Sequence, residues 1–210
     1  GRTSNEAAFL YQLFVRSFGT NNLPDCSNMC HESSGSGLTE TIGIGKGTVE
    51  LEDFEKSSLV VVMGQNPGTN HPRMLSALEK TKKNGGKIIH VNPLPEAGLV
   101  RFKHPQDYMK LSFKSTKLAD MHLPVKINGD VAFMKGIGKY LLLKNSEGLY
   151  DFDDEFISNK TKNFDSYVKS INNTKWEDIL QGSGLDKKSI EDAGELFSNS
   201  KSIIICWAMG

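Results

Sequence analysis

Residues 59–92 read LVVVMGQNPGTNHPRMLSALEKTKKNGGKIIHVN, and the class of the fold follows from this run. Its first five residues, Leu59–Met63, are apolar and rich in valine, as is typical of a strand buried on both faces. A helix is predicted over about 73–83, and the turn residues at 84–86 end it. A second strand is predicted over 87–92. Strand, helix and strand in this order predict a βαβ unit with parallel strands and a right-handed crossover.

The later part of the chain extends this unit. Residues 119–125 predict a third strand and 201–207 a further one, while the sequence between them is mostly helical. Helices are predicted over about 131–143, 153–160, 161–171, 176–181 and 187–198. Asp130 and Asp186 are natural N-caps for the first and last of these helices. The sequence therefore predicts an α/β fold, a three-layer α/β/α Rossmann-like domain with a mostly parallel sheet.

A helix is also predicted over 4–19, with Ser4 or Asn5 as its N-cap and Gly19 at its end. Its large apolar side chains recur at roughly helical spacing, and we expect them to pack in a core. These side chains are Phe9, Leu13, Val15 and Phe18. We assign residues 1–24 to a helical segment of a neighbouring domain and residues 25–210 to the α/β domain. Because a helix opens the chain and a buried strand nearly closes it, we expect an internal piece of a longer protein.

The polar run DCSNMCHESSGSG at 25–37 combines two cysteines with a histidine and follows a proline. An imidazole can take up a proton, and a nearby positive charge favours the thiolate form of cysteine, so Cys30 and His31 are candidates for a working pair. The alternative is a half-buried Cys30 that packs as a small hydrophobe beside a loop histidine. Zinc would need about four ligands, and only Cys26, Cys30 and His31 are close in sequence.

Ligands of open parallel sheets bind outside the carboxyl ends of the strands. The first two predicted strands are followed by 64–72 and 92–98, which contain Asn, Thr, Gly and Pro and suit hydrogen bonding to a nucleotide. A nicotinamide-type dinucleotide fold would carry G-x-G-x-x-G in the first loop, where this chain has GQNPG. The glycines of GIGKG at 43–47 do not match a phosphate-binding motif either, and they predict a flexible loop first and an anion site second.

The composition bears on the partners and the location of the protein. The 210 residues carry a formal net charge of zero, with 25 basic and 25 acidic side chains, which argues against a nucleic-acid partner. No apolar run of about 18 residues predicts a membrane span. The three cysteines include no C-x-x-C pair, so a disulfide framework is not expected and a reducing, cytoplasmic location is the default. Cys206 lies inside a predicted strand, where we expect a buried and inert thiol.

Taken together, these segments resemble the molybdopterin oxidoreductases that use bis-molybdopterin guanine dinucleotide, and most of all the formate-dehydrogenase-like alpha subunits. The likeness spans nearly the whole chain and rests on short motifs in a constant order. They are Cys30-His31, VMGQNP at 62–67 with His71-Pro72, KIIHVNP at 87–93, ADMH through NGD at 119–130, and WAMG at 207–210. Two positions depart from the family pattern: Asn92 stands where aspartate is usual, and Ala208 stands where glycine is usual. An amide at position 92 can still bond a base, but it lacks the charge of a carboxylate.

The resemblance implies a role for each matching residue. Cys30 would be the thiolate ligand of molybdenum or tungsten, and His31 a neighbouring proton acceptor or electrostatic partner. The residues that would line the first guanosine diphosphate pocket are Gly64, Asn66, Thr69 and Asn70. Those that would meet the guanine, the ribose or another part of the same nucleotide are Asn92, Pro93 and Asp130. Those that would approach a pterin are Met209 and Gly210.

The resemblance also implies an enzyme that moves two electrons and a proton between a small, formate-like substrate and the metal, and onward to an electron-transfer partner. The rest of the parent chain would complete the active site, and any [4Fe–4S] cluster would lie outside this chain. We expect the chain to be inactive alone, because one domain cannot enclose a two-pterin cofactor. The alternatives are a nucleotide-binding α/β domain without molybdenum and a non-catalytic scaffold that retains the fold.

Overall fold

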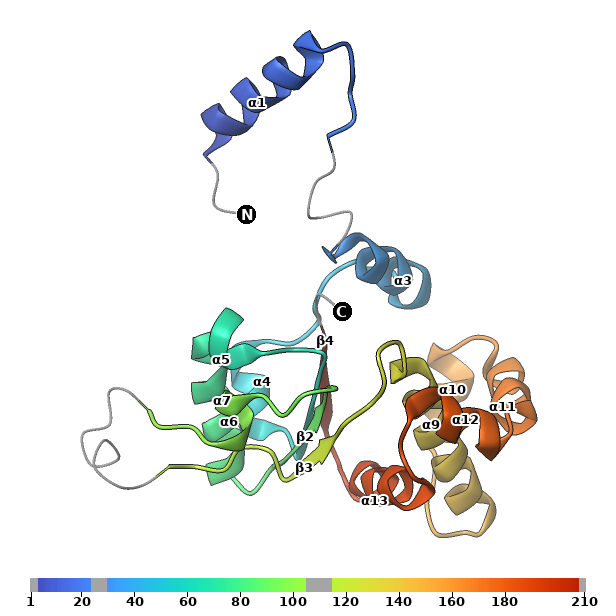
Figure 1. Ribbon diagram of the computed structural model, residues 1–210. Coiled ribbons are helices and arrows are strands. Elements are labelled where there is room, and N and C mark those ends of the chain that lie inside the picture. The colour runs from blue at the N-terminus through green and yellow to red at the C-terminus, as the bar shows by residue number, and fades with distance from the viewer. Residues whose placement is uncertain (1–3, 24–29, 105–114, 208–210) are drawn as a thin grey trace. The chain divides into compact units, whose positions relative to one another are not determined.

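The computed structural model of the protein describes residues 4–23, 30–104 and 115–207 (Figure 1). The chain divides into two compact units. The first comprises residues 1–48 together with 208–210, and the second comprises Val49–Trp207. The predicted domain boundary after residue 24 stays a prediction.

In the first unit, helix α1 (Asn5–Ser17) confirms the predicted opening helix. The Ser4 hydroxyl accepts a hydrogen bond from the amide of Ala7 at 3.3 Å, as an N-cap does. The predicted core packing of the apolar face is wrong for the described residues, because the side chains of Phe9 and Phe18 are 58% and 70% exposed. Helix α1 therefore presents an apolar surface that no described residue buries.

A second helix of this unit, α3 (Glu32–Ile42), begins directly after Cys30 and His31. The polar run at 25–37, for which no helix was predicted, is therefore helical from residue 32 onward. The helix was missed because its sequence, ESSGSGLTETI, is rich in serine and glycine, which have low helix propensity.

The glycines that follow α3 have structural roles. Gly43 ends the helix at φ +79°, a left-handed conformation that glycine adopts without strain. Gly45 packs against α3 so closely that a Cβ there would lie 2.9 Å from the carbonyl oxygen of Gly35. These contacts account for two of the three glycines at 43–47 without an anion.

The second unit is built on a four-stranded sheet. Its strands are β1 (Leu59–Met63), β2 (Lys87–Val91), β3 (Met121–Leu123) and β4 (Ile203–Trp207). Their order is β3-β2-β1-β4, and every neighbouring pair is parallel. All four strands were predicted, and the five residues of β1 are buried as the unbroken apolar run indicated. The direction of strand addition reverses between β1 and β4, which is the position where ligands of such sheets bind.

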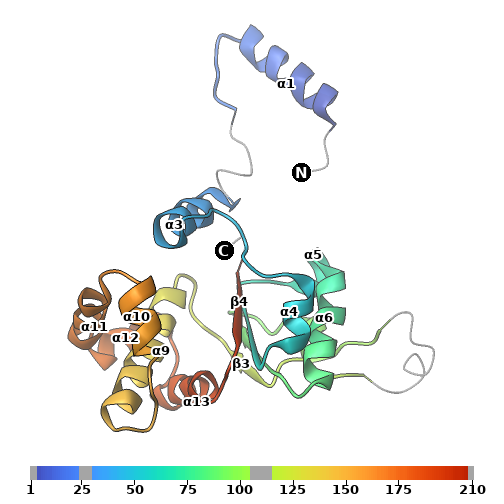
Figure 2. The same cartoon turned by 180° about the vertical axis from the view of Figure 1, so that it is seen from behind.

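Side chains alternate between the two faces of the sheet. Along β1, the odd-numbered residues pack on one helical layer and the even-numbered residues on the other. The first layer contains α9 (Asp130–Ser146), α12 (Trp176–Ser183) and α13 (Lys187–Ser198). The second contains α4 (Leu51–Lys56), α6 (Pro72–Lys83) and α7 (Ala97–Val100). Figures 1 and 2 show the two layers on opposite sides of the sheet, so the predicted three-layer architecture is confirmed.

The longer helices of this unit also match their predicted ranges to within a few residues, and they include α10 (Asp154–Lys160) and α11 (Phe164–Asn173). Asp186 caps α13 as predicted, because its carboxylate accepts a hydrogen bond from the amide of Ser189 at 2.7 Å. The predicted cap at Asp130 is wrong: Gly129 occupies the cap position of α9, and Asp130 is the first helical residue. Among the described residues, no helix is long and apolar enough to cross a bilayer.

Candidate functional site

The loop after β1 places several predicted nucleotide-binding residues at the carboxyl edge of the sheet. Gly64 leaves the strand at φ +62°, and a Cβ there would meet nothing within 4 Å. Its amide donates to the carbonyl oxygen of Val91 at 2.9 Å, so the turn is tied to the neighbouring strand. The short helix α5 (Pro67–Asn70) follows, and its Thr69 and Asn70 are exposed. The loop therefore leaves its backbone at Gly64 open to close approach by a ligand, and it exposes the polar side chains of Thr69 and Asn70.

Asn66 shapes this loop. Its side-chain oxygen accepts a hydrogen bond from the amide of Thr69 at 3.1 Å and so caps α5. Its side-chain nitrogen donates to a carboxylate oxygen of Glu96 at 2.6 Å. Because both ends of its side-chain amide are hydrogen-bonded within the protein, the main effect of Asn66 is to hold the conformation of the loop.

The loop after β2 is organised in the same way by Asn92. Its side-chain oxygen accepts from the amide of Leu94 at 3.1 Å, which is an Asx turn. Its side-chain nitrogen lies 3.5 Å from the carbonyl oxygen of Gln65, in the first loop. Pro93 is exposed beside it. The structure therefore brings the residues predicted after β1 and those predicted after β2 into one connected group.

The two loops are also packed against each other. A Cβ at Gly98 would lie 3.1 Å from the Cα of Gly68, so α5 and α7 meet through bare backbone. Glu96 belongs to this contact, and the sequence analysis missed it. The hydrogen bond that ties it to Asn66 spans 30 residues, and no local pattern signals such a bond.

The remaining predicted cofactor-binding residues are Asp130, which the structure describes, and Met209 and Gly210, which it does not. Asp130 is half-buried in the first turn of α9, after the carboxyl end of β3. Negative charge is favoured there by the helix dipole. Met209 and Gly210 lie outside the described residues, as does Cys26.

A pair of histidines that the sequence analysis also missed lies side by side in β2 and β3. The rings of His90 and His122 have centroids 5.0 Å apart. His122 Nε2 lies 2.9 Å from the carbonyl oxygen of Asn92. His90 is only 1% exposed, and its Nε2 has no hydrogen-bond partner among the described residues. Burial, and then the neighbouring His122, lowers the pKa of His90 to about 4, so its ring is neutral near pH 7.

Cys30 and His31 belong to the first unit. Cys30 is half-buried and immediately precedes His31, which is exposed at the cap position of α3. The carbonyl oxygen of His31 accepts from the amide of Gly35 at 2.8 Å. Within the described residues, no group of three or more His, Cys, Asp or Glu side chains could hold a metal ion, so these residues provide no zinc-type cluster.

Cys206 is only partly buried, and the predicted inertness of its thiol stays a prediction. It lies in β4 and packs against the core on the α6 face of the sheet. Burial raises the pKa of its thiol to about 11, which keeps it protonated at neutral pH.

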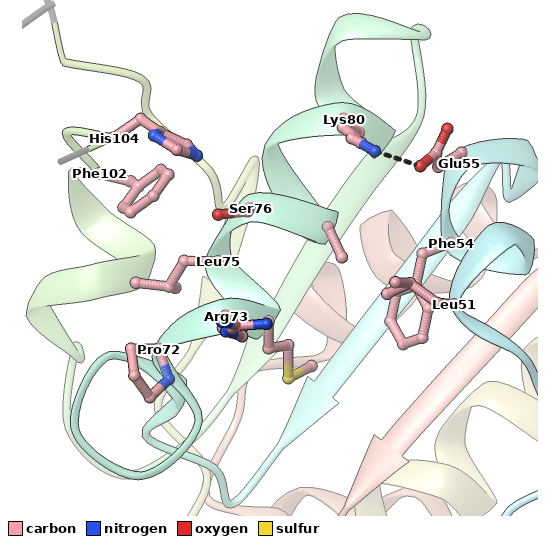
Figure 3. Close-up of a pocket in the computed structure, with 12 residues that line it drawn as sticks. Leu51, Phe54, Glu55, Pro72, Arg73, Leu75, Ser76, Lys80, Phe102 and His104 are labelled. Atoms are coloured by element: carbon pink, nitrogen blue, oxygen red, sulfur yellow. Dashed lines mark hydrogen bonds and ion pairs between the residues drawn. The ribbon is translucent and has the colours of Figure 1, made fainter. Parts of the chain in front are cut away.

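A hollow of about 690 Å³ lies on the α6 layer, where Pro72 is part of its lining (Figure 3). It runs between α4, α6 and the segment at 102–104. Its lining is largely apolar and includes the ion pair between Lys80 and Glu55, at 2.6 Å. None of the predicted site residues lines it.

Comparison with known proteins identifies a family and several similar proteins. A family model described as molybdopterin oxidoreductase matches residues 1–207. An uncharacterised oxidoreductase of Mycobacterium tuberculosis is 50% identical over 212 residues, which are 100% of this chain and 27% of that protein. Protein YdeP of Escherichia coli is 48% identical over 216 residues, covering 100% of this chain and 28% of that protein. Formate dehydrogenase H of Escherichia coli is 28% identical over 99% of this chain and 26% of its own length.

A solved structure supports the fold. Acetylene hydratase from Pelobacter acetylenicus superposes with a TM-score of 0.66 at 20% identity, covering 95% of this chain and 24% of that one. The chain spans about a quarter of the length of the curated relatives that it matches. Since the family model covers nearly all of it, the chain belongs to the molybdopterin oxidoreductase family.

Proposed function

We propose that this chain is a cofactor-binding part of a molybdenum or tungsten oxidoreductase, in which it binds a guanine nucleotide of bis-molybdopterin guanine dinucleotide and supplies Cys30 to the metal. The observation that carries the proposal is the connected group of polar residues after β1 and β2, at the carboxyl edge of a parallel sheet. Family membership argues against the alternative of a nucleotide-binding domain without molybdenum.

The chemistry of this edge fits a nucleotide. The open left-handed Gly64 allows backbone to approach a flat or charged group closely. The exposed Thr69 and Asn70 offer hydroxyl and amide groups to ribose or phosphate oxygens. The side-chain oxygen of Gln65 is buried and has no hydrogen-bond partner among the described residues. It is an acceptor of the kind that the N–H groups of guanine satisfy.

We assign roles to individual residues from their hydrogen bonds and their exposure. Asn66 and Asn92 each use both ends of the side-chain amide within the loops, so we assign them to shaping the pocket. Thr69, Asn70 and Pro93 are exposed and are assigned to direct contact with the nucleotide. Asp130 contributes a carboxylate at the same edge, and we assign Met209 and Gly210 to a pterin.

For the metal, Cys30 offers a soft sulfur ligand of the kind that suits molybdenum and tungsten. Cys30 immediately precedes His31, the cap residue of α3, so α3 follows the proposed metal ligand closely along the chain. His31 is the proposed neighbouring proton acceptor. When bound, the cofactor supplies the two-electron chemistry, and the protein supplies position and charge.

The substrate and partners of the whole protein belong to the same proposal. A formate-like substrate is supported by the 28% identity to formate dehydrogenase H. We further propose a cytoplasmic protein that passes electrons to a partner, with any [4Fe–4S] cluster in the parent outside this chain. The balanced net charge supports the expectation that nucleic acid is not a partner.

The test compares the full-length parent with Cys30→Ser and Cys206→Ser variants, all expressed where the cofactor is made. We expect roughly two guanylates and one metal per wild-type chain after acid release and elemental analysis. Cys30→Ser should keep the guanylates and lose formate-dependent dye reduction. The Cys206→Ser variant is the matched control for a thiol and should keep both. A wild-type parent without metal or guanylate would contradict the proposal and favour the non-catalytic scaffold.

A further inference from the structure

The loops after β1 and β2 meet at a hydrogen bond that no sequence motif marks. Glu96 is half-buried directly before α7, and its carboxylate accepts from the side-chain nitrogen of Asn66 at 2.6 Å. Within the part of the chain that the structure describes, Glu96 forms no ion pair with Lys, Arg or His. The Asn66 amide is therefore its main polar partner.

This bond sets the orientation of the Asn66 amide. An ionised carboxylate can only accept, so it attracts the amide nitrogen of Asn66 and repels the amide oxygen. The oxygen is then directed to the backbone amide of Thr69, which it bonds at 3.1 Å. In the flipped orientation, two acceptors would face each other at Glu96 and two donors would face each other at Thr69. Glu96 thus selects the one orientation that caps α5.

The backbone leaves little room for another arrangement. Gly68 and Gly98 are in direct contact, and a Cβ at Gly98 would lie 3.1 Å from both the Cα of Gly68 and a methyl carbon of Leu75. The start of α7 is therefore held against α5. Because Glu96 stands just before that contact, its carboxylate is brought to Asn66 without a large loss of side-chain freedom.

We propose that Glu96 is a positioning residue for nucleotide binding: it fixes the Asn66 amide and so orders α5, which presents Thr69 and Asn70 to the ligand. This inference rests on the proposed function of the carboxyl edge. Glu96 acts through Asn66 and does not itself contact the nucleotide.

The test is a double-mutant cycle in the full-length parent with Asn66→Ala, Glu96→Ala and the double variant, read by two measurements. Hydrogen–deuterium exchange reports the protection of the Thr69 amide, and acid release reports guanylate per chain. In Glu96→Ala we expect exchange at Thr69 to rise and the guanylate released per chain to fall, because losing a hydrogen bond to a charged group should weaken guanylate binding about tenfold. Adding Glu96→Ala to Asn66→Ala should change neither quantity further.

Two variants serve as controls. Glu96→Gln keeps an acceptor oxygen and should restore most of the protection at Thr69. Glu55→Gln removes a carboxylate from the ion pair with Lys80 on the α6 layer and should leave both readouts unchanged. Additive effects of Asn66→Ala and Glu96→Ala would overturn the inference, as would unchanged exchange at Thr69 in Glu96→Ala. If the wild-type parent holds no guanylate, the proposed function fails, while the exchange cycle still tests the coupling of Glu96 to Asn66.

Discussion

The buried histidine of β2 makes the stability of the second unit depend on pH. The pKa of His90 falls from about 6.5 in the unfolded chain to about 4 in the folded one, mainly through burial. Below pH 6.5 the unfolded chain takes up a proton that the folded chain excludes until about pH 4. The stability that neutral His90 allows is therefore complete above about pH 6.5 and is lost as the pH falls towards 4.

The magnitude follows from the width of this window. Each pKa unit corresponds to about 1.36 kcal/mol, so a fall from pH 6.5 to pH 5 should cost about 2 kcal/mol of unfolding free energy. His90→Phe removes the titrating group and the unpaired Nε2 while filling a similar space. Its loss of stability between pH 7 and pH 5 should therefore be smaller than that of the wild type by about 2 kcal/mol.

The assay is urea unfolding at pH 7, 6 and 5, followed by circular dichroism, for the wild type and His90→Phe. Carboxylates titrate in both proteins, so the difference between the two plots of unfolding free energy against pH isolates the contribution of His90. A His122→Gln variant should keep most of the wild-type slope, because burial contributes more to the lowered pKa than the charge of His122 does. Equal pH slopes in the wild type and His90→Phe would refute the reasoning.

Two further predictions concern packing within the second unit. Gly194→Ala should lower the unfolding free energy by about 2 kcal/mol, because a Cβ there would lie 2.8 Å from the Cγ of Tyr140 and overpacking outweighs the helix propensity of alanine. The control is Gly37→Ala in α3 of the first unit, where a Cβ would meet nothing within 4 Å. This variant should slow amide exchange in α3. Lys139→Met should cost about 1–3 kcal/mol and speed amide exchange at the end of α11, because the ammonium donates to three carbonyl oxygens there at 2.9–3.3 Å. Unchanged exchange in Lys139→Met would mean that these bonds contribute nothing measurable, and a stable Gly194→Ala would mean that the Tyr140 ring moves at no cost.

The strands could be predicted because each is an apolar run between clear turn residues. Leu59–Met63 is the best case, since its five consecutive apolar residues require cover on both faces and the structure provides it. The helix α3 could not be predicted, because its serines and glycines favour loops when considered alone. Likewise Asp130 is a good cap by residue type, but the backbone places Gly129 at that position.

The position of the candidate site could be predicted from topology, and its internal bonds could not. Parallel strands bring their carboxyl ends to one edge, so residues after β1 and β2 were expected to be neighbours. The partner of Asn66 is 30 residues away, and pairing at that distance depends on how two loops pack. In the same way, the sequence identified an apolar face on α1 but could not show that its Phe9 and Phe18 would be exposed here.

The order of the strands also has a consequence during synthesis. We expect β1 to pair with β2 soon after both leave the ribosome. Its other neighbour, β4, lies 144 residues later, which is also the separation of the hydrogen-bonded Ser58 and Ser202 just before the two strands. At about 5–20 residues per second, translation needs on the order of ten seconds to supply it. During that time one side of β1 has unpaired backbone groups and is open to pairing with other chains. We therefore expect this chain to depend on chaperones during synthesis until residues 203–207 have emerged.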